Sequence, residues 1–295
     1  MTFQLAQILP EACRISFEAG QLISQVYHQD KAVDVVQKKD GTPVTIADQK
    51  ADDFICQQLH ALTPDIPLVT EESVAKVAFD KRKQWSTYWL VDPLDGTKEF
   101  IARTGEFSVN IALIHNHKPI LGVVFGPEKG NLYLACKETD TQGQVGKLTG
   151  MSVALDSQSL HWQSLVKTAP AISVAPHPDK IKSLGGALKV AVSRRHGGEI
   201  KHFMQQLGDC STMHMGSALK ACLVAEGKAD VYPRLGPTSL WDTAASQCIV
   251  EMAGGAILNA AKHPLEYVQT ESLLNPFFIV VSHKDYNWPQ FPEIF

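Results

Sequence analysis

The sequence lacks the cysteine patterns that bind zinc or staple small secreted domains. None of its six cysteines stands in a CxxC pair or another zinc-ligand spacing. Several stand beside Ala, Leu and Ile, as buried thiols do. We therefore expect free, buried thiols in a reducing compartment. The six are Cys13, Cys56, Cys136, Cys210, Cys222 and Cys248.

Long apolar runs are also missing. The run Phe277–Val281 has the length of a strand and is far too short to cross a bilayer. Near the N-terminus, Pro10, Glu11 and Arg14 interrupt the apolar residues, so the chain lacks the apolar core of a secretory signal. We expect a cytoplasmic protein without a transmembrane segment. The sequence leaves open a peripheral association with the inner face of the plasma membrane.

An excess of positive charge is absent as well. The chain has 27 Lys and Arg against 31 Asp and Glu, for a net charge of -4. No basic stripe stands out, which argues against a general nucleic-acid-binding protein. There is no dinucleotide-binding fingerprint, internal repeat or low-complexity tract. Composition is that of an ordinary globular protein, 44% hydrophobic and 20% charged.

Apolar periodicity predicts an α+β first half. Apolar residues recur at helical spacing from Leu5 to about Tyr27, and again over 47–59 after a turn at 40–43. Short apolar segments then follow in quick succession and predict an antiparallel sheet. We predict strands over 66–69, 88–91, 107–114, 120–125 and 132–135.

The second half alternates strands and helices, which favours a mixed α/β unit. A polar, turn-rich stretch over 139–150 marks the expected boundary, giving an N-terminal domain over 1–150 and a C-terminal domain over 151–295. Proline and glycine make 156–186 an irregular connection with no clear period. Beyond it we predict strands over 188–192, 229–232 and 277–281, and helices over 200–207, 219–227 and 241–252.

The motif Asp92-Pro93-Leu94-Asp95-Gly96-Thr97 follows an apolar strand. Proline fixes one backbone angle and glycine permits a tight turn, so this loop can aim two carboxylates and a carbonyl into one cavity. Like charges so close repel each other, and a divalent cation relieves the repulsion.

Other acidic residues complete an all-oxygen donor set. Glu71 and Asp242 each follow an expected strand or open an expected helix, and no His or Cys converges with them. Oxygen ligands of this kind suit magnesium, manganese or calcium rather than zinc. Each residue alone has an ordinary explanation: Asp92 and Asp95 as turn residues, and Asp48 and Asp242 as helix caps. Their joint occurrence favours a metal site.

At residues 89–100 the string WLVDPLDGTKEF resembles the signature of the inositol monophosphatase superfamily. TEES at 70–73 and WDTAA at 241–245 resemble its other two metal motifs, in the same order and spacing. The resemblance covers about 40–127 and 188–283. It implies a layered αβαβα sugar-phosphatase fold, with an antiparallel N-terminal sheet and a mixed C-terminal α/β half.

Further segments resemble the bisphosphate nucleotidase branch of that superfamily. DGTKEF at 95–100 and GEFSVNIALI at 105–114 differ from inositol monophosphatases, which more typically follow DGT with Thr-Asn-Phe. GSALK at 216–220 and YPR at 232–234 also resemble the nucleotidase branch. The implied substrate is adenosine 3',5'-bisphosphate, giving AMP and phosphate, with 3'-phosphoadenylyl sulfate as a second substrate. The resemblance also implies a role in sulfur metabolism and inhibition by lithium.

The resemblance implies a metal-ligand set with two or three Mg²⁺ ions, for which Mn²⁺ can substitute. Glu71, Asp92 and the Leu94 carbonyl would hold the first ion, and Asp92, Asp95 and Asp242 the second. A third ion would bind near Glu71 once substrate arrives. Metals of this kind activate a water for in-line attack on phosphorus.

Catalytic and substrate-binding roles follow from the same resemblance. Asp48, Thr97 and Glu71 are the implied catalytic residues, with the Thr97 hydroxyl orienting the attacking water and passing its proton to Asp48. Ser217 is expected to start a helix, whose N-H groups favour an anion. Lys220 and Arg234 can bind the phosphate that is not cleaved. The implied substrate contacts are Gly96, Thr97, Ser193, His196, Gly216, Ser217, Lys220, Arg234 and Asp242.

Two alternatives compete with this hypothesis. The nearest is an inositol monophosphatase or other sugar phosphatase with the same metal core. From a different class, the chain is compatible with a non-catalytic sensor of a nucleotide or of magnesium, although a sensor would be expected to lack a ligand or Thr97. A monomer and a homodimer are both compatible with the sequence.

Overall fold

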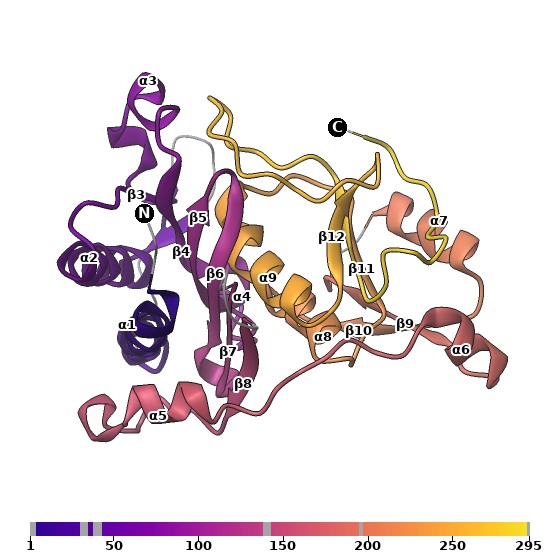
Figure 1. Ribbon diagram of the computed structural model, residues 1–295, viewed down its shortest axis with the longest axis horizontal. Helices are drawn as coiled ribbons and strands as arrows, with labels where there is room; N and C mark the ends of the chain where they lie inside the picture. Colours follow the sequence, from indigo (N-terminus) through magenta and orange to yellow (C-terminus); the bar gives the residue numbers. More distant parts are fainter. Residues whose placement is uncertain (1–3, 30–34, 38–42, 138–142, 195–196, 294–295) are drawn as a thin grey trace.

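The computed structural model describes residues 4–29, 35–37, 43–137, 143–194 and 197–293. Two main sheets alternate with three layers of helices, in the order helix, sheet, helix, sheet, helix (Figure 1). This confirms the predicted αβαβα layering. Within the described ranges, no helix has both the length and the apolar character needed to cross a membrane.

The first sheet has six strands in the order β3-β4-β5-β6-β7-β8. Four neighbouring pairs are antiparallel, as predicted, but β3 pairs with β4 in parallel. The sixth strand corrects the interpretation of 139–150 as a turn-rich boundary, because much of that stretch pairs with β7. The strands are β3 (Leu68–Thr70), β4 (Thr87–Asp95), β5 (Ser108–His115), β6 (Lys118–Gly126), β7 (Asn131–Cys136) and β8 (Gln144–Thr149).

Helices α1 (Leu5–Tyr27) and α2 (Ile46–Leu62) cover one face of this sheet (Figure 1). Both helices confirm the predicted stripes, and α1 continues through Gly20 as expected. Thr45 caps α2 and forms a capping box with Asp48. A small hairpin, β1 (Val35–Gln37) and β2 (Pro43–Thr45), precedes α2. The predicted turn at 40–43 falls mostly outside the described residues.

The second sheet has five strands in the order β10-β9-β11-β13-β12. The first three are parallel, and β13 runs antiparallel to its neighbours β11 and β12, which confirms the mixed character predicted for this half. Sequence reasoning missed β10 and β12, and β13 lies between β11 and β12. The strands are β9 (Leu188–Val192), β10 (Cys210–His214), β11 (Val231–Arg234), β12 (Ala256–Asn259) and β13 (Phe278–Val281).

Helices α8 (Leu219–Ala225) and α9 (Leu240–Met252) fill the layer between the two sheets. One buried apolar cluster includes residues of both sheets and of these helices, so the middle layer belongs to both halves. The division into domains at residue 150 stays a prediction. On the outer face of the second sheet lie α6 (Pro178–Ser183) and α7 (Gly198–Leu207). Two short helices, α3 (Phe79–Arg82) and α4 (Thr97–Ile101), precede and follow β4 in the sequence.

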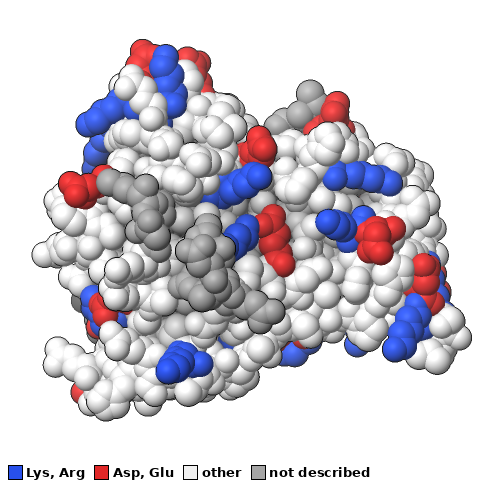
Figure 2. Space-filling model, in the orientation of Figure 1, with Lys and Arg blue, Asp and Glu red and all other residues white. Residues whose placement is uncertain are grey.

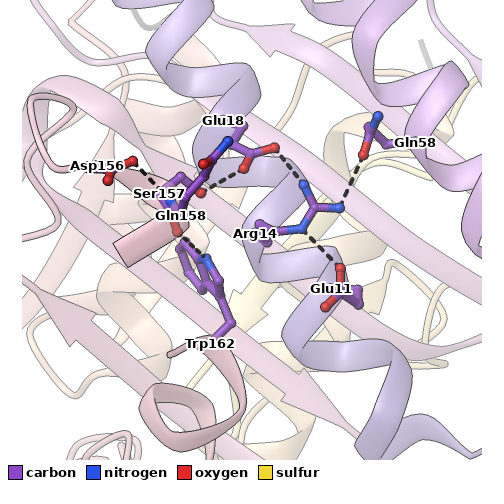
Figure 3. A network of polar contacts seen from close by, with 8 residues as sticks. All are labelled: Glu11, Arg14, Glu18, Gln58, Asp156, Ser157, Gln158 and Trp162. Atoms are coloured by element: carbon purple, nitrogen blue, oxygen red, sulfur yellow. Dashed lines mark hydrogen bonds and ion pairs between the residues drawn. The ribbon is translucent and has the colours of Figure 1, made fainter. Parts of the chain in front are cut away.

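The stretch 156–186 is more ordered than predicted. Its first part folds into α5 (Trp162–Lys167), which packs on α1. The Ser157 hydroxyl donates to a Glu18 carboxylate oxygen at 2.6 Å, and the buried Trp162 ring lies 5.4 Å from the Phe17 ring. Figure 3 shows the polar network that joins this segment to α1. The segment therefore extends the N-terminal helix layer.

The described cysteines are all free, which agrees with the prediction. Cys13, Cys136, Cys222 and Cys248 are buried, whereas Cys56 and Cys210 are partly exposed. On the face shown in Figure 2, basic and acidic residues lie interspersed, with no continuous basic band.

Candidate metal and phosphate site

The carboxylates of the DPLDGT motif lie at the end of β4. The pairing of β4 with β5 shifts register between Asp92 and Asp95, so the strand bulges there and re-aims its side chains. The buried Asp92 carboxylate accepts a hydrogen bond from the Leu94 amide at 3.0 Å. Gly96 has a φ of 93°, a left-handed conformation that favours glycine, and it ends the strand before α4 begins.

Glu71 reaches the same edge because β3 and β4 are parallel. Their carboxyl ends therefore meet, and the Glu71 amide donates to the Val91 carbonyl at 3.2 Å. Asp242 comes from the first turn of α9, where its carboxylate accepts from the Ser239 amide at 3.0 Å. Asp242 is therefore part of the helix cap, and this hydrogen bond holds its carboxylate in place.

Asp95 joins the two halves of the chain. Its Oδ2 accepts a hydrogen bond from the Ala218 amide at 2.5 Å and another from the Asn110 side chain at 3.3 Å. Sequence reasoning had not assigned Asn110, although it lies in the GEFSVNIALI segment. Burial raises the pKa of Asp95, and the Lys220 charge acts in the opposite direction.

The carboxylates are close enough to perturb one another. Burial, followed by the charges of Glu71, Asp95 and Asp242, raises the pKa of Asp92 well above its usual range. Burial and then the charge of Asp95 raise the pKa of Asp242 to about 8. Four carboxylates that disfavour each other's ionisation form a strongly negative site when deprotonated.

This donor set fits a hard divalent cation. Every candidate ligand is an oxygen, and a bound cation would offset both the burial and the mutual repulsion of the carboxylates. In the part of the chain that the structure describes, no three His, Cys, Asp or Glu side chains are gathered as a ready-made metal site. The assignment of individual ligands to individual ions therefore stays a prediction.

Thr97 and Asp48 form the predicted hydrogen-bonded pair. The Thr97 hydroxyl lies 3.2 Å from one Asp48 carboxylate oxygen and 3.4 Å from the Leu94 carbonyl oxygen. The other Asp48 oxygen accepts from the Thr45 amide and hydroxyl, both at 2.7 Å. Burial raises the pKa of Asp48, with these hydrogen bonds acting in the opposite direction.

A cavity of about 600 Å³ opens beside these carboxylates. Its wall brings together seven of the residues predicted from sequence, and it adds others that were not predicted, chiefly Lys98, Glu99, Arg194, Tyr232 and Thr238. Glu71, Asp92, Leu94, Thr97 and Gly216 do not form part of the wall. His196 lies outside the described residues. The seven are Asp95, Gly96, Ser193, Ser217, Lys220, Arg234 and Asp242.

Ser217 corrects one expectation. It does not start a helix, because α8 begins at Leu219 and Ser217 itself has a φ of 50°. Gly216 before it is packed against Glu106, whose carbonyl oxygen would lie only 2.3 Å from a Cβ at that position. The Gly-Ser pair is therefore a tight turn that only glycine permits at its first residue.

The two cations predicted from sequence lie at the acidic end of the cavity. Lys220 is only 5% exposed, and its ammonium donates to the Ser217 carbonyl at 2.7 Å and lies 5.2 Å from the centre of the Tyr232 ring. Arg234 donates to the Pro237 carbonyl at 2.9 Å, and its charge lowers the pKa of Asp242. Both side chains therefore make specific contacts in the cavity, whereas a lysine or arginine is usually a solvated surface charge.

Comparison with known proteins agrees with this geometry. The inositol monophosphatase family matches residues 4–285. The chain belongs to the inositol monophosphatase family. Enzymes of this family are generally magnesium-dependent phosphatases, which agrees with the all-oxygen donor set.

Within the family, the similar curated proteins are nucleotidases. The 3'(2'),5'-bisphosphate nucleotidase CysQ of Escherichia coli K12 is 42% identical over 274 residues, which cover 92% of this chain and 99% of that protein. The protein of the same name from Haemophilus influenzae is 34% identical and covers 95% of each chain. Among solved structures, CysQ from Bacteroides thetaiotaomicron matches with a TM-score of 0.77 and 38% identity over 92% of this chain and 96% of that one.

A structure of lower sequence identity is similar in fold. The inositol monophosphatase of Thermotoga maritima matches with a TM-score of 0.67 at 20% identity, over 92% of this chain and 90% of that chain.

Proposed function

We propose that this protein is a magnesium-dependent 3'(2'),5'-bisphosphate nucleotidase, a phosphoric monoester hydrolase. Its substrate is adenosine 3',5'-bisphosphate, which it converts to AMP and inorganic phosphate, and it also accepts 3'-phosphoadenylyl sulfate. The observation that carries the proposal is the group of mutually repelling carboxylates at one end of a cavity whose wall also holds four cations. A chain 42% identical to a bisphosphate nucleotidase supports this choice of substrate.

Two or three Mg²⁺ ions would be held by Glu71, Asp92, Asp95, Asp242 and the Leu94 carbonyl, and Mn²⁺ would substitute. When bound, magnesium supplies Lewis-acid stabilisation of the charge on the phosphoryl group and acidifies water. The protein's own part is to hold the carboxylates in place. Asp92 is fixed by the Leu94 amide and Asp242 by the Ser239 amide.

Thr97 and Asp48 orient the attacking water and remove its proton. The Thr97 hydroxyl donates to Asp48, so its own lone pairs are left to accept a hydrogen bond from water. A carboxylate with a raised pKa is a stronger base than an ordinary one, and burial raises the pKa of Asp48. The pair can therefore pass a proton from water through the hydroxyl to Asp48.

The cavity beyond the carboxylates takes the nucleotide. Its wall includes Ser193 and Ser217 from loops, Arg234 from the end of β11 and Lys220 from the first turn of α8. β9, β10 and β11 are parallel, and their carboxyl ends meet at this side of the sheet. Ligands of open α/β sheets bind at such an edge.

The test is magnesium-dependent phosphate release by the purified protein. Adenosine 3',5'-bisphosphate, 3'-phosphoadenylyl sulfate and inositol 1-phosphate are compared at equal concentrations, each with magnesium and with EDTA. We expect the highest kcat/KM for adenosine 3',5'-bisphosphate and no turnover in EDTA. A higher kcat/KM for inositol 1-phosphate would replace the proposal with the sugar-phosphatase alternative. No turnover on any of the three would favour the non-catalytic sensor.

A further inference from the structure

Arg194 is a cation of the cavity wall that the metal motifs do not account for. It follows β9 directly after Ser193, and its side chain is 56% exposed. Its Nη2 donates to one oxygen of Glu106 at 2.5 Å, and its Nε donates to the other at 3.2 Å. The guanidinium is therefore held by two parallel hydrogen bonds in one plane.

Glu106 is built into the fold. Its side chain is 5% exposed, and its backbone and Cβ pack against Gly216 with no room for a larger residue. Its amide donates to the Thr104 hydroxyl at 3.3 Å, and Thr104 also lines the cavity. Glu106 thus contacts two residues of the cavity wall, Thr104 through its amide and Arg194 through its carboxylate, and it packs against Gly216 just before the wall residue Ser217.

This pairing leaves the far edge of the guanidinium available. An arginine has five N-H donors, and Glu106 takes one from Nε and one from Nη2. Nη1 makes no hydrogen bond to any residue that the structure describes. Among the described residues, three of its N-H groups therefore have no partner, in the fork geometry that binds a phosphate with two hydrogen bonds.

From the sequence, Lys220 and Arg234 were expected to bind the uncleaved phosphate, but in the structure both cations act on carboxylates at the acidic end of the cavity. Lys220 acts on Asp95 and Arg234 on Asp242, both of which are proposed metal ligands. Arg194 instead pairs with Glu106, which belongs to none of the metal motifs. Arg194 lies at the carboxyl end of β9, on the side of the cavity where we propose that the nucleotide binds.

We propose that Arg194 binds the phosphate that is not cleaved, and that Glu106 is the positioning residue that fixes its guanidinium. The inference rests on the proposed nucleotidase function and makes Arg194 the residue that distinguishes bisphosphates from monophosphates. Lysine at this position keeps the charge but loses the fork, so it replaces arginine only in part.

The experiment compares steady-state kinetics on adenosine 3',5'-bisphosphate and on 3'-AMP, which lacks the second phosphate. We expect Arg194→Ala to lower kcat/KM for the bisphosphate about tenfold more than for 3'-AMP, since a charge-assisted hydrogen-bonded contact of this kind is lost. The difference should reside in KM rather than kcat. Inhibition by the product AMP should weaken by a similar factor, and Arg194→Lys should give an intermediate loss.

Glu106→Gln tests the positioning role. It should raise KM for the bisphosphate by less than Arg194→Ala does, and the double variant should be no worse than Arg194→Ala, because Glu106 acts through Arg194. Lys201→Ala, which removes an exposed cation from α7, is the matched control and should keep the wild-type ratio between the two substrates.

The outcomes separate the two proposals. If Arg194→Ala keeps the wild-type preference for the bisphosphate, the assignment of Arg194 is wrong while the nucleotidase function stands. If the wild-type protein does not hydrolyse the bisphosphate, both are wrong. Additive losses from Glu106→Gln and Arg194→Ala would refute the positioning role, and thermal melting of each variant confirms that it is folded.

Discussion

Asp242→Asn should make the metal-free protein more stable while removing its activity. Asparagine has nearly the same shape and keeps an oxygen to accept the Ser239 amide, so the cap of α9 survives. It cannot ionise. The substitution therefore removes one charge from the carboxylate group and leaves its packing in place.

The magnitude follows from the pKa of Asp242, which is 3.8 in the unfolded reference and about 8 in the folded protein. At pH 7 the folded carboxyl keeps a proton that the unfolded chain has lost, which costs about 1.36 kcal/mol per pH unit over about three units, or roughly 4 kcal/mol. Neighbouring carboxylates share this titration, so we expect a gain in unfolding free energy of about 2–4 kcal/mol.

The pH dependence has a definite sign. Because the folded pKa is raised, Asp242 lowers the stability of the metal-free protein as pH increases above 3.8, and this loss levels off beyond about 8. The gain in unfolding free energy from Asp242→Asn should therefore be small near pH 3.8 and should grow as the pH approaches about 8. Melting curves in EDTA, taken over this range, measure the difference directly.

Magnesium should reverse the order of stability. A cation that binds the native state raises the melting temperature of the wild-type protein, and the Asp242→Asn variant should lose most of that shift together with turnover. At pH 7 in EDTA we expect the variant to melt about 4–8 °C higher than wild type. A variant that melts lower than wild type in EDTA, or that keeps the full magnesium shift, would refute the reasoning.

Three further substitutions test other parts of the site. Thr97→Ala should lower kcat about 100-fold with little change in KM, because it removes the hydroxyl that orients water; an unchanged turnover number would exclude the relay. Gly216→Ala should lower the unfolding free energy by about 1–3 kcal/mol, as a Cβ there would lie 2.3 Å from the Glu106 carbonyl oxygen; wild-type stability in urea would contradict that packing. Trp162→Ala should cost about 3 kcal/mol through lost contact with Phe17 yet leave KM unchanged, and a large change in KM would show that α5 reaches the substrate.

Elements with a strong local pattern were predictable from the sequence. α1 and α2 carry long apolar stripes, and α9 ends at Met252, close to a Gly254-Gly255 pair of the kind that typically stops a helix. The strands β5 to β7 are buried, largely apolar and separated by short turns, so their antiparallel succession followed as well. Patterns of this kind depend only on residues close in sequence.

Elements defined by their partners were not predictable. β10 is Cys-Ser-Thr-Met-His at the edge of its sheet, and its polar residues give no strand signal until β9 lies beside it. β12 has only four residues, directly after two glycines. The parallel pairing of β3 with β4, which brings Glu71 to Asp92, likewise depends on contacts that no local pattern records.

The candidate site shows the same division. The acidic motifs were visible in the sequence, since their residue types and spacing resemble those of a known family. The pairing of Glu106 with Arg194 and the hydrogen bond from Asn110 to Asp95 were not, because 88 and 15 residues separate the partners. Burial of Lys220 also reversed what a lone lysine would suggest.

The most direct test of the metal site is anomalous scattering from a crystal of this protein soaked with manganese. We predict at least two peaks within coordination distance of Glu71, Asp92, Asp95 and Asp242, next to the cavity that Arg194 lines. A map from an active crystal form with no peak among these four carboxylates would contradict the account.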